Sequence, residues 1–142
     1  MRDWLLLTPL GRLGDAGLLL LRVVTGAFLI SQTIDNVTST ERMLEFEKFL
    51  TQFGFWAPAL MAPLSVWVQF LGGAALVLGL LTRWAGLLIA FNFAVAVWMV
   101  HWAEDFRGWW PALILVFLGI LFATQGPGRY ALDTVLERRS RA

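Results

Sequence analysis

Long stretches without a charged side chain constrain this chain more than any other feature. No Asp, Glu, Lys or Arg occurs in residues 49–82, 84–103 or 108–128. A helix needs about 20 mostly apolar residues to cross a hydrocarbon core of about 30 Å, because each residue adds about 1.5 Å. The second and third stretches each have the length of one crossing. The chain is therefore predicted to be an integral membrane protein.

Two further crossings follow from the way the other apolar stretches are interrupted. The first charge-free stretch is too long for one helix, but Gly54, Pro58 and Pro63 break its beginning, since Gly and Pro interrupt regular structure. Upstream, another apolar stretch contains a single charged residue, Arg22, before it ends at Asp35. Four crossings are thus predicted, at about residues 16–35, 59–81, 84–103 and 109–125.

The composition and the continuity of these stretches define the fold class. Only 15% of the residues are charged, against roughly 25% in soluble domains. Lipid cannot satisfy free backbone donors and acceptors, so spanning segments are helices or closed barrels. A barrel needs alternating apolar and polar residues, whereas these stretches are continuous. We predict an all-α, four-helix transmembrane bundle that forms one domain over residues 1–142. The chain has no Cys, which excludes disulfides, thiolate metal sites and thiol chemistry.

The distribution of Lys and Arg predicts the orientation. The two termini, the first crossing and the turn between the second and third crossings together carry eight Arg residues. The other side of the membrane would carry only Arg42, Lys48 and Arg107, accompanied by five acidic residues. Because loops rich in Lys and Arg stay in the cytoplasm, both termini are predicted to be cytoplasmic, including a tail over residues 129–142.

The connection between the first two crossings is predicted to be an amphipathic helix over residues 40–53. Its apolar face repeats through Met43, Phe46, Leu50 and Phe53, and charged residues occupy the other face. Such a helix lies in the headgroup region of a membrane. Ser39 or Thr40 is expected to cap its beginning, because a hydroxyl can accept a hydrogen bond from a free backbone N–H group.

Amide side chains at membrane depth are costly unless they find partners, so each is a candidate site residue. Gln69 precedes Gly72 and Gly73, which allow a second helix to approach closely. The preferred interpretation of Gln69 and Asn92 is therefore a hydrogen bond between helices. The alternative is that they are polar contacts in a ligand cavity. Gln32, near the end of the first crossing, is expected to share one interior space with Gln69.

The remaining candidates are charged or titratable. Arg22 is expected to have a structural role, either extending back to the cytoplasmic headgroups or pairing with Asp133 or another C-terminal acid. Asp35 could approach His101 and its neighbour Glu104 at the opposite side of the membrane. One His with carboxylates is a weak metal signal, so the preferred interpretation is a solvated acidic rim. No metal site and no catalytic residue is assigned.

Three motifs in order resemble the DoxX family of small bacterial membrane proteins, over residues 18–133. The first crossing contains Leu-Arg-x-x-x-Gly. The second contains Gly-Gly, an apolar run and then Leu-Thr-Arg. The tail reads Gly-Pro-Gly-Arg-x-x-Leu-Asp. The segments that carry the resemblance are residues 19–28, 69–83 and 126–133.

This chain departs from the family pattern at membrane depth. Gln69 stands where many members have Glu, and Gln32 and Asn36 stand where many have His, often followed by Lys. Neutral amides cannot act as acids or bases. We therefore expect no proton-linked role at these positions.

The resemblance implies a four-helix bundle in the bacterial inner membrane that associates with redox systems, as a subunit of thiosulfate:quinone oxidoreductase or a partner of redox enzymes. We predict a noncatalytic subunit or scaffold with a hydrophobic groove for quinone or lipid and no intrinsic cofactor. The alternatives are a quinone-linked oxidoreductase subunit with direct catalysis, or a transporter of small molecules or lipids. Membrane lipid, a redox-enzyme subunit and a second copy of the chain are the expected partners. The net charge of +1 gives no reason to expect nucleic acid.

Overall fold

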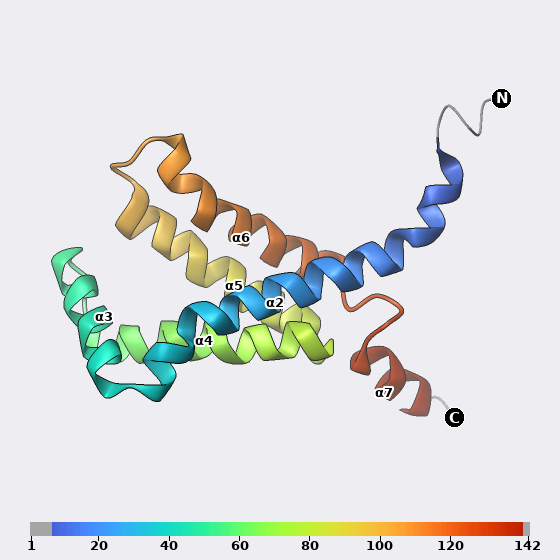
Figure 1. The fold of residues 1–142 in the computed structure, drawn as a ribbon, viewed down its shortest axis with the longest axis horizontal. Coiled ribbons are helices and arrows are strands. Elements are labelled where there is room, and N and C mark those ends of the chain that lie inside the picture. Colours follow the sequence, from blue (N-terminus) through green and yellow to red (C-terminus); the bar gives the residue numbers. More distant parts are fainter. Residues whose placement is uncertain (1–6, 141–142) are drawn as a thin grey trace.

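The structure, a computed structural model, describes residues 7–140 as helices joined by short turns, with no strand in that range (Figure 1). Four spans are long and apolar enough to cross a membrane, and the first begins at Pro9, earlier than predicted. The predicted all-α fold, with four such spans and a helix between the first and second, is confirmed. The elements are η1 (Thr8–Leu13), α2 (Gly14–Thr38), α3 (Thr40–Gln52), α4 (Pro58–Leu78), α5 (Thr82–Ala96), the π-helical turn η2 (Val97–His101), α6 (Phe106–Gln125) and α7 (Leu132–Ser140).

Helix α3 is the amphipathic helix between the first two spans. Ser39 caps it by accepting a hydrogen bond from the backbone N–H of Arg42. On its exposed face Arg42 lies 2.9 Å from Glu45, and this hydrogen bond raises the pKa of Arg42. On the other face Leu50 is buried. The helix packs against α4, so its apolar face is covered at least partly by protein.

The four long helices form two pairs, α2 with α4 and α5 with α6, joined by contact between α4 and α5. Each pair meets at glycines. A Cβ on Gly73 would lie 2.7 Å from the carbonyl oxygen of Gly26, and a Cβ on Gly86 would lie 2.6 Å from that of Gly119. The backbones of each pair are therefore in direct contact, the arrangement that small residues permit between membrane helices.

The two pairs also end in the same way. Gly79 follows α4 and Gly126 follows α6, and both have positive φ, at 68° and 81°. A Cβ on Gly79 would lie 2.8 Å from Arg22 Nη2, and a Cβ on Gly126 would lie 2.8 Å from Arg83 Nη2. Each hairpin thus places an Arg from its first helix against a glycine that ends its second helix. The bundle consists of two similarly built hairpins.

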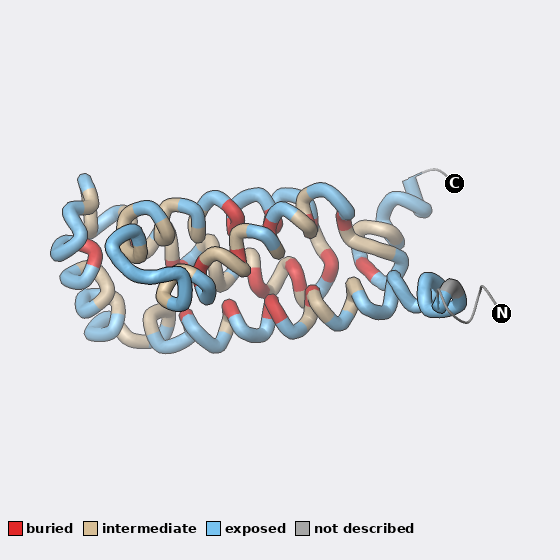
Figure 2. Tube along the Cα trace, turned by 90° about the horizontal axis from the view of Figure 1, so that it is seen from above, coloured by how far each residue is buried: buried red, intermediate tan, exposed pale blue. Residues whose placement is uncertain are grey.

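The core runs along the inner sides of the helices, as the buried segments in Figure 2 show. Its central members, Leu29, Leu76, Ile89 and Phe122, have no exposed surface. Many large apolar side chains instead cover the outside of the four spans. An outer surface of this kind is expected where lipid is the solvent, because lipid does not penalise apolar exposure.

Arg22 is buried, with only 1% of its surface exposed, so it does not extend to headgroups. Its guanidinium donates hydrogen bonds to the carbonyls of Pro127 and Tyr130, the second at 2.7 Å. It forms no ion pair with Asp133. The expected extension to the headgroups and the expected ion pair with Asp133 are therefore wrong, because the loop after α6 folds over α2 and supplies carbonyls that no helix satisfies. The contacts that Arg22 makes instead are these hydrogen bonds to the loop. We call residues 126–133 the C-terminal latch.

Asp133 has a different partner, the beginning of α5. Its carboxylate accepts hydrogen bonds from the backbone N–H groups of Leu81 and Thr82, at 2.8 and 2.9 Å. These groups have no partner inside a helix, so an acceptor from elsewhere stabilises the helix end. Arg83 likewise donates to two carbonyls in the last turn of α6. The three motifs that resemble the DoxX family therefore meet at one end of the bundle, which we call the latch end.

Candidate ligand-binding cavity

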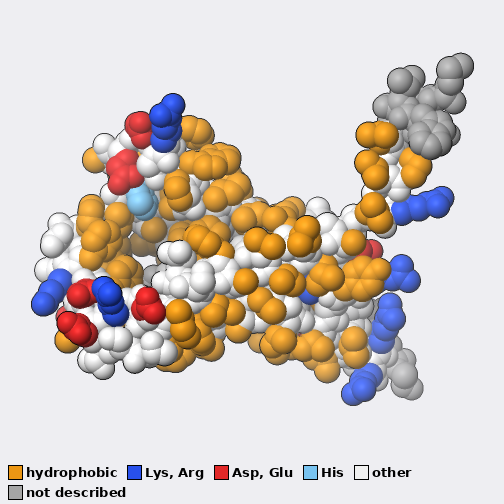
Figure 3. Space-filling model, viewed as in Figure 1, with side chains coloured by type: hydrophobic (Ala, Val, Ile, Leu, Met, Phe, Trp, Pro, Cys, Tyr) orange, Lys and Arg blue, Asp and Glu red, His pale blue; other side chains and the backbone are white. Residues whose placement is uncertain are grey.

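A cavity of about 650 Å³ lies at the opposite end of the bundle, between α3, α4 and α5. Figure 3 shows the surface hollowed between α3 and the turn that joins η2 to α6, with the single His near its edge. Most of its lining is apolar, including Phe46 and Phe49 from α3 and Leu64 from α4. This volume and lining are typical of small-molecule sites, which measure roughly 300–1,000 Å³.

Gln69 places an amide in the wall of this cavity. Its Nε2 donates to Ser65 one turn earlier in α4, at 3.1 Å to the hydroxyl and 3.3 Å to the carbonyl. This bond stays within one helix, so the predicted hydrogen bond from Gln69 to another helix is wrong. The amide is half-buried and lines the cavity, which is the alternative interpretation. Its Oε1 has no partner among residues 7–140.

Asn92 faces the same cavity from α5. Its side chain is half-buried and makes no hydrogen bond within the part of the chain that the structure describes. The interhelical bond predicted for Asn92 is therefore not formed. The amide keeps part of its surface exposed, so it can both donate to and accept from a molecule in the cavity. Gln69 thus offers its Oε1 as an acceptor, and Asn92 offers both a donor and an acceptor, to a molecule in the cavity.

His101 completes the polar lining at the end of α5. It closes the π-helical turn η2, a rare geometry that often occurs at functional sites. Its Nδ1 lies 2.9 Å from Oε2 of Glu104, and the Glu104 side chain is exposed. Asp105 is exposed as well and caps α6 by accepting from Gly108 N at 3.1 Å. Within residues 7–140 no group of three His, Cys, Asp or Glu side chains is placed to hold a metal ion.

Two predicted site residues lie outside the cavity. Gln32 and Asp35 are exposed on α2 and do not line it. The prediction that Gln32 shares an interior space with Gln69 is therefore wrong. The face of α2 that packs against α4 carries Leu29 and Thr33, both buried, and the 100° turn per residue rotates Gln32 away from that face.

One wall of the cavity was not predicted from the sequence. Phe46, Phe49 and Leu50 contribute the face of α3 that lines it. The signal was present, since Phe46 and Leu50 belong to the apolar face of the amphipathic helix. That face was assigned to the membrane surface, because the pattern shows that a face is apolar but not what covers it.

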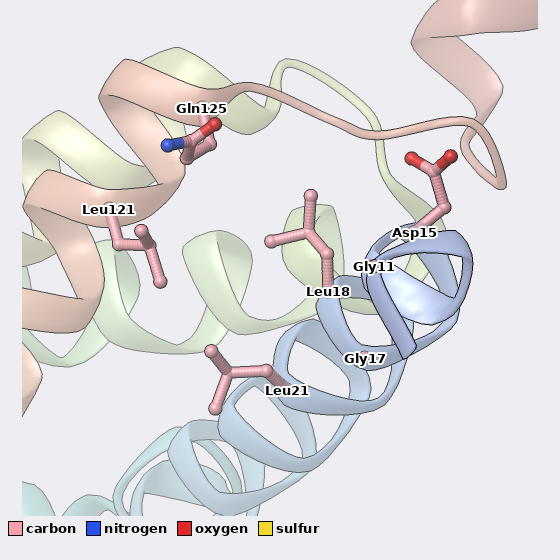
Figure 4. A pocket seen from close by; sticks show the side chains of 8 residues that line it. Gly11, Asp15, Gly17, Leu18, Leu21, Leu121 and Gln125 are labelled. Carbon is pink, nitrogen blue, oxygen red and sulfur yellow. The ribbon is translucent and has the colours of Figure 1, made fainter. Parts of the chain in front are cut away.

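A second, shallower groove of about 500 Å³ lies at the latch end between α2 and α6. In Figure 4 Leu18, Leu21 and Leu121 project into the space between the two helices. Asp15 instead points toward the C-terminal latch and accepts a hydrogen bond from Arg129 N at 3.1 Å. The groove brings few free polar groups together, so the cavity beside α3 is the better candidate for a specific ligand.

The fold and the cavity define a multi-pass helical membrane protein that has a cavity with polar side chains between its helices. Residues 17–102 match the DoxX family, so this chain belongs to that family. The chain is also similar to inner membrane protein YqjF of Escherichia coli (strain K12). The two are 26% identical over 132 residues, which cover 90% of this chain and 98% of YqjF. No solved structure matches the chain.

Proposed function

We propose that this protein is a noncatalytic membrane subunit that holds a quinone-class molecule for a redox-enzyme partner. The observation that carries the proposal is the cavity of about 650 Å³, whose mostly apolar lining contains the amide side chains of Gln69 and Asn92. A quinone-class molecule has a neutral ring with two hydrogen-bonding oxygens and an apolar tail. Neutral amides can hold and orient such a ring, although they cannot exchange protons with it.

The charge of the lining favours this ligand over a phospholipid. No Lys or Arg among the described residues 7–140 lines the cavity, whereas phosphate groups are usually bound by Arg or Lys. A neutral ring needs no such cation. The link to redox enzymes is supported by the DoxX family membership, because the family resemblance implies association with quinone-linked systems.

The amides provide a direct test of the binding site. Replacing Asn92 by Leu is expected to weaken binding of decylubiquinone about tenfold, because the Asn92 amide can donate to a ring carbonyl. Replacing Gln69 by Leu should weaken binding of the reduced form, decylubiquinol, to a similar extent, because the free Oε1 of Gln69 can accept from a ring hydroxyl. The free energy of unfolding should change by only about 1 kcal/mol. Binding is measured by titration of the purified protein in detergent. Quinone that remains bound after gentle extraction is measured by native mass spectrometry, which also reports lipid and protein partners.

Gln32→Leu is the matched control, since it makes the same chemical change at an exposed position of α2. It should bind quinone as the wild type does. Wild-type affinity in both Gln69→Leu and Asn92→Leu would contradict the assignment of the cavity. A phospholipid retained in place of quinone would contradict the choice of ligand.

The proposed location is the inner membrane, with the latch end in the cytoplasm. The proposal is supported by charge, because Arg residues gather at the latch end and acidic residues at the cavity end (Figure 3). Loops that stay in the cytoplasm carry the excess of Lys and Arg. The inner membrane is also the location stated in the name of the relative YqjF.

Single cysteines test this orientation, and the chain has no native Cys to interfere. In intact cells a membrane-impermeant thiol reagent should label Cys at Gln52 but not Cys at Ser140. After the cells are permeabilised, both positions should react. If only Ser140→Cys were labelled in intact cells, the orientation would be the opposite of the one proposed. If both positions were labelled in intact cells, four crossings would be contradicted.

A further inference from the structure

We propose that the cavity prefers the reduced, hydroxyl-bearing form of its ligand, the quinol, and that His101 and Glu104 create this preference. The inference rests on the proposed function, since it concerns which form of a quinone-class molecule is held. It comes from the hydrogen-bonding roles of the ring nitrogens of His101, which lines the cavity.

Glu104 determines which nitrogen of His101 carries the proton. Its Oε2 lies 2.9 Å from Nδ1, and an ionised carboxylate can only accept hydrogen bonds. Neutral His101 must therefore carry its hydrogen on Nδ1 and donate it to Glu104. This leaves Nε2 with a lone pair and no proton, so it can only accept. Nε2 has no partner among residues 7–140.

An acceptor at the edge of the cavity distinguishes the two forms of the ring. A quinone carbonyl also only accepts, so facing Nε2 it would bring two lone pairs together. A quinol hydroxyl can donate to Nε2. Gln69 adds a second free acceptor, because its Nε2 is engaged by Ser65 while its Oε1 is free. The Asn92 amide can serve either form, since it both donates and accepts.

Acid should reduce the preference. Protonated His101 donates from both nitrogens, so Nε2 becomes a donor that suits a carbonyl. The other lining residues contributed by α3, α4 and α5 include no titratable side chain. Toward α6, Asp105 caps the helix and Arg107 is exposed. The His101–Glu104 pair is therefore the titratable contact that borders the cavity.

The test compares decylubiquinol and decylubiquinone on the purified protein in detergent, under argon so that the quinol stays reduced. At about pH 8 the quinol should bind about tenfold more tightly, as expected for one good hydrogen bond gained. At about pH 5 the ratio should fall, because a protonated imidazole ring offers a donor at Nε2. Glu104→Gln should reduce the preference at the higher pH, because a neutral amide can donate to Nδ1 and allow the proton to move to Nε2.

Glu41→Gln is the matched control, an identical change on the exposed face of α3, and it should keep the preference of the wild type. His101→Leu should keep only the smaller preference that the free Oε1 of Gln69 supplies. Equal binding of both forms by the wild type at about pH 8 would overturn this inference and leave the proposed function standing. A preference that is undiminished in Glu104→Gln would also overturn it. If neither form binds, both proposals fail.

Discussion

Arg22→Leu is expected to lower the free energy of unfolding by about 3 kcal/mol and to free the C-terminal latch from α2. The guanidinium is buried and donates to the carbonyls of Pro127 and Tyr130. Without it both carbonyls lose a charged donor, and each such bond contributes about 1.5–3 kcal/mol. Thermal unfolding in detergent measures the first effect. The rate of tryptic cleavage after Arg129, inside the latch, measures the second.

Arg12→Leu is the control, because Arg12 is exposed on η1 near the same end of the bundle. It removes the same charge and should change neither quantity. Arg22→Lys should fall between wild type and Arg22→Leu, since an ammonium lacks the planar fork of guanidinium donors that reaches two carbonyls. If Arg22→Leu and Arg12→Leu unfold and are cleaved alike, the latch is held by other contacts.

The spans could be predicted because lipid imposes a requirement that the sequence displays directly. A spanning helix must be long, apolar and free of charge. The charge-free stretches that follow Lys48, Arg83 and Arg107 therefore indicate three of the crossings. Helix α3 could be predicted as well, since its polar and apolar faces differ. The family resemblance, built on three short motifs, is confirmed over residues 17–102.

The rotation of each long helix could not be predicted in the same way. In a soluble helix the apolar stripe identifies the buried face, but a membrane helix is apolar toward both lipid and protein. Gln32 and Gln69 therefore looked alike in the sequence, although only Gln69 lines the cavity. The stretch of α2 that packs on α4 is identified by Gly26, which meets Gly73.

Hydrogen bonds between residues far apart in the chain could not be predicted either. Arg22 and Tyr130 are 108 positions apart, and Asp133 is 51 positions from Thr82. Each motif can be found in the sequence. The periodicity of a helix does not, however, indicate which backbone groups of another element lack a hydrogen-bond partner. The hydrogen bonds of the C-terminal latch follow from the fold, which places the loop after α6 beside α2 and the beginning of α5.

Gly86→Ala is expected to lower the free energy of unfolding by about 2 kcal/mol through overpacking between α5 and α6. The added Cβ would lie 2.6 Å from the carbonyl oxygen of Gly119 and 2.7 Å from the backbone nitrogen of Ala123. Both neighbours are backbone atoms, so no side chain can rotate away and the helices must separate. Gly73→Ala should act similarly between α4 and α2, where the Cβ would meet the carbonyl oxygen of Gly26 at 2.7 Å.

Gly17→Ala on α2 separates this packing effect from the general effect of adding a methyl group to a helical glycine. Nothing lies within 4 Å of a Cβ at Gly17, so the change should leave stability unaltered or raise it, because Ala favours helix over Gly by about 1 kcal/mol. The same favourable term acts at Gly86, so any loss there must come from the contact with α6. Equal thermal stability of Gly86→Ala and Gly17→Ala would show that α5 and α6 do not cross at this glycine pair. A loss at Gly86 but none at Gly73 would show that the two hairpins, although similarly built, are not held together in the same way.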